Sequence, residues 1–478
     1  MRNFEDKSRS IIKNNKIDKT DKNQRDQQER DRQECIEYKV FKVHMIQDLG
    51  DIKRLMGLLK KDGKMRSKLD YEKNKKYGLL KYSDEQIKNE QWEKDDLNFV
   101  IEELKKEKRD KYFQNVADKY EQIKPVSDSS VRRDQKVEIA KQLRDEDTNV
   151  LIRGLPRIGK TSMCRCLIKY QLGTNSIFID VTTGESTSRN KSLEDFQKNF
   201  GKNAIARFIA EKELPNAELK DIFNKKDKII KLIEKSQKFP FEFLNDYLKD
   251  ELKGEKIFLF LDEIIGLAEQ PEKMKYLANL KKNLLRQVQL AIVLHRSASF
   301  EDSFKEIFEG YKTHFVQSLT IEEVKVLVDE PLKGTEIIFT DDAIEKIFEF
   351  TGGRPMEINN LCWALMHPIS KNKNLKFIYR AKDIEKLTSK KVEELEESFS
   401  AAINIYNEVY DAFISNEERA IINKLIKERE VPVSEIDADT VQPLIDTTLV
   451  TKDESEEIYR INGVLFEKVI SERLKRDG

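Results

Sequence analysis

Short apolar runs alternate with helical patterns in the middle of the chain. The runs are rich in β-branched and aliphatic side chains, as strands buried on both faces are. They cover residues 149–153, 176–181, 257–261 and 290–294. Because the stretches between them have helical patterns, we expect parallel strands joined by helical crossovers. The pattern predicts an α/β fold on a parallel sheet, with a long helical insertion at residues 192–253.

The hydrophobic pattern changes near residue 319. From there to about residue 391 it is wholly helical, and we expect helices at residues 321–329, 341–350 and 356–366. Thr340 stands where the second of these helices needs an N-cap. The sequence therefore predicts an all-helical segment after the sheet.

Residues 399–478 have the pattern of a small module of helices and a hairpin. A helix is expected at residues 416–427, with Ser415 as its N-cap. A turn at residues 453–455 then joins two strands, at 449–452 and 457–461. This order of elements resembles a winged helix.

The N-terminal part of the chain is strongly polar. Residues 1–36 contain almost no apolar side chains to bury, so we expect a disordered, charged segment. Apolar residues return in residues 37–124. Among them, one helix face is formed by residues at three-and-four spacing, namely Leu97, Val100, Ile101 and Leu104. We expect a charged, mostly helical region there, followed by a linker at residues 125–130.

Composition supports a multidomain helical protein. The chain has 478 residues, with 88 Lys and Arg against 88 Asp and Glu, and therefore a formal net charge of 0. A neutral chain has no summed field that would attract nucleic acid or an anionic membrane. Charged residues make up 37% of the chain while Gly and Pro number only 17 and 10. This balance favours charged helices over a turn-rich β protein.

Membrane and disulfide signals are absent from the sequence. No apolar run reaches the roughly 18 residues of a membrane-spanning helix, and residues 1–14 lack the apolar stretch of a signal peptide. We therefore expect a cytoplasmic protein with no membrane partner. Cys35, Cys164, Cys166 and Cys362 are too few for a disulfide framework, so we expect reduced thiols. Cys164 and Cys166 either pack in the interior or respond to oxidation, and packing is the commoner role.

A phosphate-binding pattern follows the first predicted strand. The segment from Gly154 to Thr161 fits G-x-x-x-x-G-K-[ST] without substitution. Its glycines let the backbone wrap closely around phosphates, and the following helix adds a partial positive charge. Lys160 would reach the β and γ phosphates of ATP, and the Thr161 hydroxyl would bind Mg²⁺. The alternative is a glycine-containing turn with an incidental lysine.

Two carboxylates end the third predicted strand. Asp262 would hold Mg²⁺, and Glu263 would polarise the water that attacks the γ phosphate. We expect the sheet to place this strand beside the strand that leads into the phosphate-binding loop. The alternative is that the acids only begin the next helix, where carboxylates favour the positive end of the dipole.

The fourth predicted strand ends in His295, Arg296 and Ser297. An arginine beside a triphosphate can pair with it bidentately, so Arg296 is our candidate catalytic sensor of the γ phosphate. An ordinary surface arginine is the alternative. His295 could orient a phosphate or a water, although a histidine at a strand end more often caps or packs.

With these residues, the chain resembles the STAND class of AAA+-related P-loop ATPases, especially its archaeal and bacterial members. The resemblance spans about residues 126–475 and rests on Gly154–Ser162, Asp262-Glu263, His295-Arg296 and Thr351–Pro355. It implies a helical lid over the nucleotide, a winged-helix module behind it, and a switch set by ATP or ADP. It also implies that Pro355 packs near the adenine. In a simpler interpretation, glycine only ends one helix there and proline begins the next, and both can hold.

The family's glycine-arginine-glutamate signature is present only as Val131-Arg132-Arg133-Asp134, so the sequence leaves the choice between ATP and GTP open. The residues predicted to bind nucleotide are Gly154, Leu155, Pro156, Arg157, Ile158, Gly159, Lys160, Thr161, Ser162 and Pro355. The predicted catalytic residues are Lys160, Glu263 and Arg296, and the predicted Mg²⁺ ligands are Thr161 and Asp262. The predicted domains are a lead-in at 1–36, a helical region at 37–124, a P-loop NTPase core at 125–318, a lid at 319–398 and a winged-helix-like module at 399–478.

Three functions fit this sequence. The first is a Mg²⁺-dependent, ATP-hydrolysing conformational switch. The second is a DNA-associated ATPase of the origin-recognition type, but residues 437–448 contain three aspartates and no lysine or arginine, which argues against nucleic acid. The third is a scaffold that binds nucleotide without hydrolysing it. We expect a protein partner or self-association, through the N-terminal region or in the ATP-bound form.

Overall fold

The computed structural model describes most of the chain after residue 108. The described residues are 109–120, 131–173, 175–181, 192–251, 255–264, 270–280, 288–295, 306–367 and 375–477. They belong to two compact units. The smaller unit contains residues 109–120, 328–343, 361–367 and 375–387, and the larger contains the other described residues. The predicted lead-in at 1–36, the apolar stripe at 97–104, the linker at 125–130, and Cys35, Arg296 and Ser297 lie outside the described residues.

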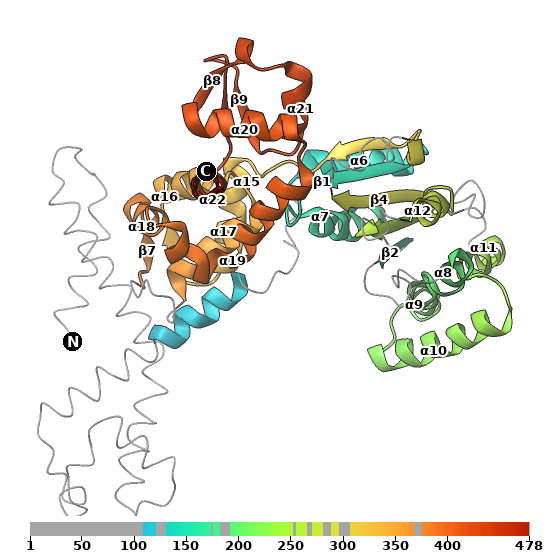
Figure 1. The fold of residues 1–478 in the computed structure, drawn as a ribbon. Helices are drawn as coiled ribbons and strands as arrows, with labels where there is room; N and C mark the ends of the chain where they lie inside the picture. Colours follow the sequence, from blue (N-terminus) through green and yellow to red (C-terminus); the bar gives the residue numbers. More distant parts are fainter. Residues whose placement is uncertain are drawn as a thin grey trace, which may run out of the picture. The chain divides into compact units, whose positions relative to one another are not determined.

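The larger unit contains a five-stranded parallel sheet (Figure 1). Its order is β2-β3-β4-β1-β5. The strands are β1 (Val150–Gly154), β2 (Ser176–Asp180), β3 (Ile257–Asp262), β4 (Val288–His295) and β5 (Lys312–Phe315). The predicted α/β fold is therefore confirmed, and four of the five strands lie where the sequence placed them. The fifth, β5, is short and half-polar and was not predicted.

One prediction about the sheet is wrong. We expected the strand that leads into the loop to lie beside the strand that carries the acids, but β4 lies between β1 and β3. Every residue of β4 except His295 is buried. A strand of this kind is most stable in the middle of a sheet, with paired neighbours on both edges and helices on both faces. The central position of β4 brings His295 between the loop and the acids.

The helices around the sheet fall into two groups, and the second group forms the predicted insertion. The first group is α6 (Arg133–Arg144), α7 (Lys160–Leu167), the π-helix η2 (Ile168–Leu172) and α12 (Pro271–Ala278). The insertion between β2 and β3 is α8 (Leu193–Asn199), α9 (Lys202–Glu213), α10 (Leu219–Lys235) and α11 (Pro240–Glu251). Phe196, Phe200 and Phe241 from the insertion are buried in one cluster with residues of β2, β3 and β4. This shared core includes residues of β3, the strand whose C-terminal end carries the acids.

The segment after the sheet contains two short strands as well as helices. Its elements are α15 (Ile321–Asp329), η6 (Glu330–Leu332), β6 (Ile338–Phe339), α16 (Asp341–Thr351), α17 (Pro355–Met366), β7 (Ile378–Tyr379) and α18 (Ala381–Thr388). The three predicted helices are confirmed, but the prediction that this segment is wholly helical is wrong, because β6 and β7 pair in parallel. Strands of two residues are too short to show a period of two. Their pairing is supported by Phe339 and Tyr379, whose rings stack 4.8 Å apart.

The smaller unit is held by aromatic side chains. Residues 109–120 are helical, as predicted for that part of the N-terminal region. The ring of Phe113 lies 5.1 Å from that of Phe377, and the Tyr120 hydroxyl donates to the carbonyl of Val328. Burial raises the pKa of Tyr120 above its ordinary value. The unit therefore joins segments that are far apart in the sequence.

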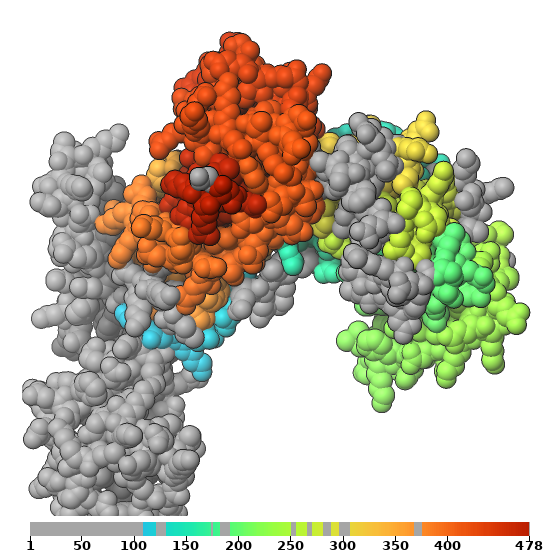
Figure 2. Space-filling model, in the orientation of Figure 1, coloured from blue at the N-terminus to red at the C-terminus, as the bar shows by residue number. Residues whose placement is uncertain are grey.

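The C-terminal module consists of residues 388–477 of the larger unit. Its elements are α19 (Val392–Glu408), the π-helix η7 (Val409–Phe413), α20 (Asn416–Glu428), β8 (Glu430–Pro432), η8 (Val433–Glu435), α21 (Ala438–Asp446), β9 (Val450–Asp453), β10 (Ile458–Ile461) and α22 (Val464–Asp477). The predicted hairpin is present as β9 and β10, and β8 completes an antiparallel sheet. Ser415 caps α20 in a reciprocal capping box with Glu418, as predicted for the cap. Figure 2 shows these residues, in orange and red, as one continuous surface.

The described thiols fit a further expectation. Cys164, Cys166 and Cys362 are buried and free, which supports the packing interpretation. Burial raises the pKa of Cys164, so this thiol resists ionisation. Among the helices of the described segments, none has the length and apolar character that crossing a bilayer requires.

Candidate nucleotide site

The phosphate-binding pattern forms a loop between β1 and α7. Gly159 adopts a φ of +100°, and a Cβ atom there would lie 2.9 Å from the Arg132 guanidinium, so only glycine fits. Helix α7 begins at Lys160, and no side chain caps its N-terminus. The first amides of this helix and its dipole are therefore directed at the loop, as an anion site requires.

The ammonium group of Lys160 is folded back under the loop. Its Nζ donates to the carbonyls of Leu155, at 2.8 Å, and Gly154, at 3.2 Å, and lies 2.9 Å from Nδ1 of His295. Burial lowers the pKa of Lys160 to about 8, while the nearby Glu263 and Asp262 carboxylates oppose that change. At neutral pH this lysine is still a cation, and phosphate oxygens would be stronger partners for it than neutral carbonyls.

Thr161 and Asp262 form the predicted metal-binding pair. The Thr161 hydroxyl donates to Oδ2 of Asp262, although the two residues are far apart in sequence. The second carboxylate oxygen accepts the backbone N–H of Glu263 at 2.9 Å. Burial raises the pKa of Asp262, so a cation near this carboxylate would stabilise its charged form. A hydroxyl and a carboxylate are both oxygen ligands of the kind that Mg²⁺ prefers, and the donor set fits that ion.

Thr161 and Asp262 alone would not complete the coordination of a metal ion. In the described part of the chain, no three His, Cys, Asp or Glu side chains are grouped so that they could hold a metal. Mg²⁺ in phosphoryl-transfer sites is held by one or two protein oxygens together with phosphate oxygens and water. Thr161 and Asp262 therefore match a metal that arrives with its nucleotide.

His295 joins the lysine of the loop to the acid of β3. Because an ammonium can only donate, Nδ1 of His295 accepts from Lys160 and the ring proton lies on Nε2. This Nε2 donates to Oε2 of Glu263 at 2.9 Å. The hydrogen bond is the main reason that the pKa of Glu263 lies below its ordinary value. The sequence suggested a phosphate, a water or simple packing for His295, and the structure instead places its two ring nitrogens on Lys160 and Glu263.

Glu263 has an unusual backbone. Its φ of +57° is left-handed, in a residue with a long side chain directly after a strand. Such conformations cost about 1–3 kcal/mol and concentrate where a side chain must be aimed at a ligand. Seven other non-glycine residues in the described part of the chain share a left-handed φ, so the backbone leaves both interpretations of Glu263 open.

Arg132 contacts the loop, although the sequence analysis did not predict it as a site residue. Its guanidinium donates to the carbonyls of Ile158, at 2.8 Å, and Gln317, at 2.7 Å, and its backbone N–H donates to the carboxylate of Glu323. Burial lowers its pKa to about 10, which leaves it charged at neutral pH. Arg132 thus ties the residues before α6 to the loop and to the segment that leaves β5. The sequence feature that could have indicated this role is the position of Arg132 in the weak match Val131-Arg132-Arg133-Asp134 to the family's signature.

The turn before Pro355 is packed between other backbone segments. A Cβ on Gly353, whose φ is +73°, would lie 2.3 Å from the carbonyl of Leu319. The Cγ of Pro355 lies 3.8 Å from the position of a Cβ on Gly159, so this proline is next to the phosphate-binding loop. Helix α16 ends at Thr351 and α17 begins at Pro355, which confirms the simpler interpretation of this motif.

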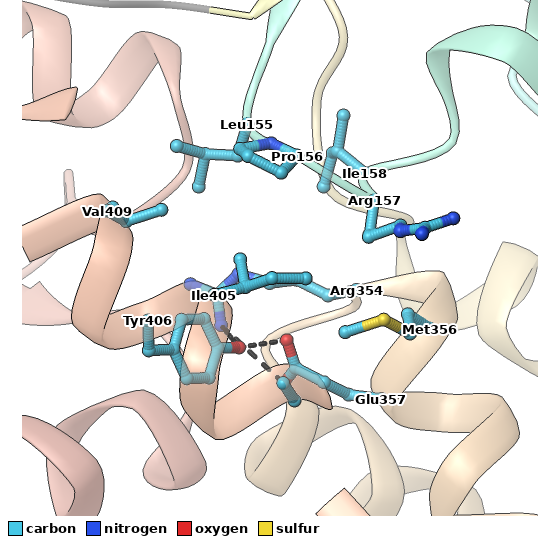
Figure 3. A pocket seen from close by; sticks show the side chains of 11 residues that line it. Leu155, Pro156, Arg157, Ile158, Arg354, Met356, Glu357, Ile405, Tyr406 and Val409 are labelled. Carbon is cyan, nitrogen blue, oxygen red and sulfur yellow. Dashed lines mark hydrogen bonds and ion pairs between the residues drawn. The ribbon is translucent and has the colours of Figure 1, made fainter. Parts of the chain in front are cut away.

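A pocket joins the loop to the turn and to α19. Figure 3 shows loop residues on one side of it, and Tyr406 and Glu357 on the other. The lining residues are Leu155, Pro156, Arg157, Ile158, Arg354, Met356, Glu357, Ala402, Ile405, Tyr406 and Val409. The sequence did not indicate this meeting of three segments.

Arg354 holds the C-terminal module against the turn. Its Nη2 donates to the carbonyls of Thr448, at 3.1 Å, and Asn462, at 2.8 Å. Its Nη1 donates to the Tyr406 hydroxyl at 3.0 Å, and this hydroxyl donates to Oε1 of Glu357. Arg354 and Glu357 are almost completely buried. Burial raises the pKa of Glu357 to about 8, with Arg354 opposing the change.

We predict that Glu357 makes the folded chain less stable as the pH rises. Its pKa is about 8 when folded and about 4.3 in an unfolded chain. Between these values the folded state keeps a proton that the unfolded state has lost. Stability should therefore fall with rising pH, by at most about 1.4 kcal/mol per pH unit. Glu357→Gln should remove this slope.

The measurement is the unfolding midpoint of the parent and of Glu357→Gln between about pH 5 and pH 8. Glu345→Gln, at an exposed carboxyl on α16, is the matched control and should keep the parent's slope. Equal slopes in the parent and in Glu357→Gln would show that the buried carboxyl is ionised throughout.

Known structures resemble the chain weakly. The Walker-type ATPase of Pyrococcus abyssi is 13% identical with a TM-score of 0.40, over 72% of this chain and 96% of its own. The Aeropyrum pernix ORC1 protein in complex with DNA is 13% identical with a TM-score of 0.31, over 72% and 93%. The Thermotoga maritima RuvB Holliday junction branch migration motor is 14% identical with a TM-score of 0.32, over 72% and 93%.

No protein-family model and no curated protein matches the chain. Because the TM-scores are low, the α/β fold rests on the order of the parallel sheet and on the loop between β1 and α7. The structure brings together Lys160, Thr161, Asp262 and Glu263 as the sequence predicted, and adds His295 between them.

Proposed function

We propose that the chain is a Mg²⁺-dependent ATPase of the P-loop class, related to AAA+ and STAND proteins. One observation carries the proposal. The loop supplies Lys160 and Thr161, and both lie within hydrogen-bonding reach of groups that end β3 and β4, namely Asp262 and His295. Phosphoryl transfer uses a lysine, a hydroxyl and paired acids, and here these groups lie at or beyond the C-terminal ends of β1 and β3.

Each residue has a separate task in this proposal. The amides of the loop and of the start of α7 bind phosphate oxygens, and Lys160 neutralises the β and γ phosphates. Bound Mg²⁺ would supply further neutralisation between the phosphates, and Thr161 and Asp262 would hold it. Glu263 stays ionised at neutral pH because its pKa is lowered, so it can accept the proton of the attacking water. His295 orients Glu263 through Oε2.

We further propose that residues 319–398 form a lid and residues 399–478 a winged-helix module that respond to the bound nucleotide. The support is the pocket in which loop residues, Met356 and Tyr406 meet, together with the bonds from Arg354 to Thr448 and Asn462. A phosphate that draws Lys160 away from the Leu155 carbonyl would change the loop side of this pocket. Pro355, beside Gly159, is the proposed contact for the base, and Arg296 stays a predicted sensor.

The proposed activity is tested by phosphate release from ATP, with the full chain in Mg²⁺ and in excess chelator. We expect turnover that requires Mg²⁺. Thr161→Val should lower it by about two orders of magnitude, since a hydroxyl ligand is lost while the side chain keeps its shape. ATP binding without any phosphate release by the parent would instead support the nucleotide-gated scaffold.

We do not propose DNA as a ligand, although one resembling structure is described as a complex with DNA. Helix α21 would be the recognition helix of a winged-helix module, and it carries Asp439 and Asp446 with Asp437 as its N-cap. The turn between β9 and β10 is acidic as well, from Asp453 to Glu457. Phosphates would be repelled by both surfaces.

We predict that the full chain shows no duplex binding that weakens steeply with salt. The measurement is fluorescence polarisation of a labelled duplex at about 50 mM and about 200 mM salt. Tight binding at the lower concentration that falls by about a thousandfold at the higher one would overturn this prediction. Self-association in the ATP-bound form, a protein partner for residues 1–124 and a cytoplasmic location stay predictions.

A further inference from the structure

The π-helix η7 is held to the rest of the C-terminal module by hydrogen bonds and an ion pair. Asp411 forms a bidentate pair with Arg473 of α22, with N–O distances of 2.6 and 2.9 Å. The Tyr410 hydroxyl donates to Asn423 of α20 at 2.8 Å. Arg419 of α20 donates to the carbonyl of Asp411. These bonds tie the π-turn to both α20 and α22, so η7 moves with the module.

The last residue of η7 contacts the nucleotide site. The Phe413 ring meets the His295 ring edge to face, with centroids 6.3 Å apart and an interplanar angle of 82°. Phe413 is 9% exposed, and His295 is the residue whose two ring nitrogens engage Lys160 and Glu263. An aromatic edge-to-face pair contributes stabilisation beyond the area that it buries. The contact therefore restrains the orientation of the imidazole.

Phe413 reaches His295 from the end of a π-turn. A π-helix inserts an extra residue into a turn and rotates the following side chains relative to an α-helix, and such turns recur at functional sites. Helix α19 ends at Glu408, and η7 begins at Val409. Along this continuous segment, Tyr406 and Val409 line the pocket at the loop and Phe413 contacts His295. One segment of the module thus reaches both the pocket at the loop and His295.

We propose that Phe413 is a positioning residue of the nucleotide site, which holds the His295 ring so that it orients Glu263 and thereby couples the position of the C-terminal module to hydrolysis. The inference rests on the proposed ATPase function. Phe413 itself touches no reacting atom. If the module moves away from the sheet, the His295 ring loses its restraint and Glu263 loses a fixed direction.

Simple core packing is the competing explanation for Phe413. It predicts that a smaller side chain weakens folding wherever it is placed in α19 or η7. Phe399 is a matched control, because it is a buried phenylalanine of α19 that packs edge to face on Phe350 and not on His295. Leucine at either position keeps an apolar side chain of moderate size.

The first test is ATP turnover by the full chain with Phe413→Leu, Phe399→Leu, His295→Asn and the double variant His295→Asn/Phe413→Leu. We expect Phe413→Leu to lower kcat by about three- to tenfold while the Kd for ATP stays within about twofold of the parent. Phe399→Leu should leave kcat near the parent's. In the His295→Asn background, Phe413→Leu should have no further effect, because its action passes through His295.

The second test does not depend on turnover. The chain has only 4 histidines, so nitrogen-15 labelling of histidine gives few ring signals, and His295→Asn assigns the one of interest. In the parent, this ring should show a single tautomer with the proton on Nε2. Phe413→Leu should convert it to a mixture of tautomers, and Phe399→Leu should not.

Three results would overturn the inference. The first is an unchanged His295 tautomer and an unchanged kcat in Phe413→Leu. The second is an equal loss of kcat in Phe413→Leu and Phe399→Leu. The third is full additivity of the effects of Phe413→Leu and His295→Asn on kcat. A parent without phosphate release would contradict the proposed ATPase, while the tautomer measurement would still decide whether Phe413 positions His295.

Discussion

Lys160→Ala is expected to weaken ATP binding by at least about a hundredfold and to abolish turnover. The ammonium lies beneath the loop, beside the Leu155 and Gly154 carbonyls. Its pKa of about 8 keeps it charged at neutral pH. Alanine removes this charge from beneath the loop, so the phosphates lose the cation that lies beside the Leu155 and Gly154 carbonyls. The measurement is the Kd for ATP by calorimetry.

Lys169→Ala is the matched control for this variant. Lys169 is exposed on η2, the continuation of α7. The Lys169→Ala variant should therefore bind ATP with the parent's affinity. The two variants lose the same charge from one continuous helical segment, so a general effect of charge would appear in both. Parent-like affinity in Lys160→Ala would show that the loop is not a phosphate site.

Glu263→Gln is expected to retain ATP binding and to lower turnover by about a thousandfold or more. Glutamine keeps the shape of the side chain and an oxygen that can accept from Nε2 of His295. It cannot take up the proton of the attacking water, so the chemical step fails while the complex still forms. The measurement is single-turnover hydrolysis together with the Kd for ATP.

Glu255→Gln controls for the loss of a carboxylate near β3. Glu255 is exposed just before the other end of this strand, where its carboxylate accepts a hydrogen bond from Asn175, and its replacement should leave turnover unchanged. If Glu263→Gln hydrolysed ATP at the parent's rate, the proton acceptor would be another group. If it failed to bind ATP, the carboxylate would act in binding and not in the chemical step.

Local features of the molecule could be predicted from sequence. The loop from Gly154 to Thr161 is specified by residue types that a tight phosphate-binding backbone needs, so it was located without a structure. The capping box of Ser415 and the hairpin of β9 and β10 also depend on residues close in sequence. In each case the determining interactions span only a few positions.

Features that depend on distant pairing could not be predicted. The sequence showed that β1, β3 and β4 are apolar, but not that β4 lies between the other two. That order alone decides that His295 reaches both Lys160 and Glu263. The bonds from Arg354 to Thr448 and Asn462 join segments that no periodicity connects. The site residues were therefore predicted individually, while the connections between them required the fold.

The most direct test of the account is a structure of the full chain with Mg²⁺ and a non-hydrolysable ATP analogue. The account predicts the triphosphate inside the loop, Nζ of Lys160 within hydrogen-bonding distance of its oxygens, and the metal next to Thr161 and Asp262. Nucleotide bound elsewhere, or a loop that still holds Lys160 on the Leu155 carbonyl with no phosphate inside it, would contradict the account.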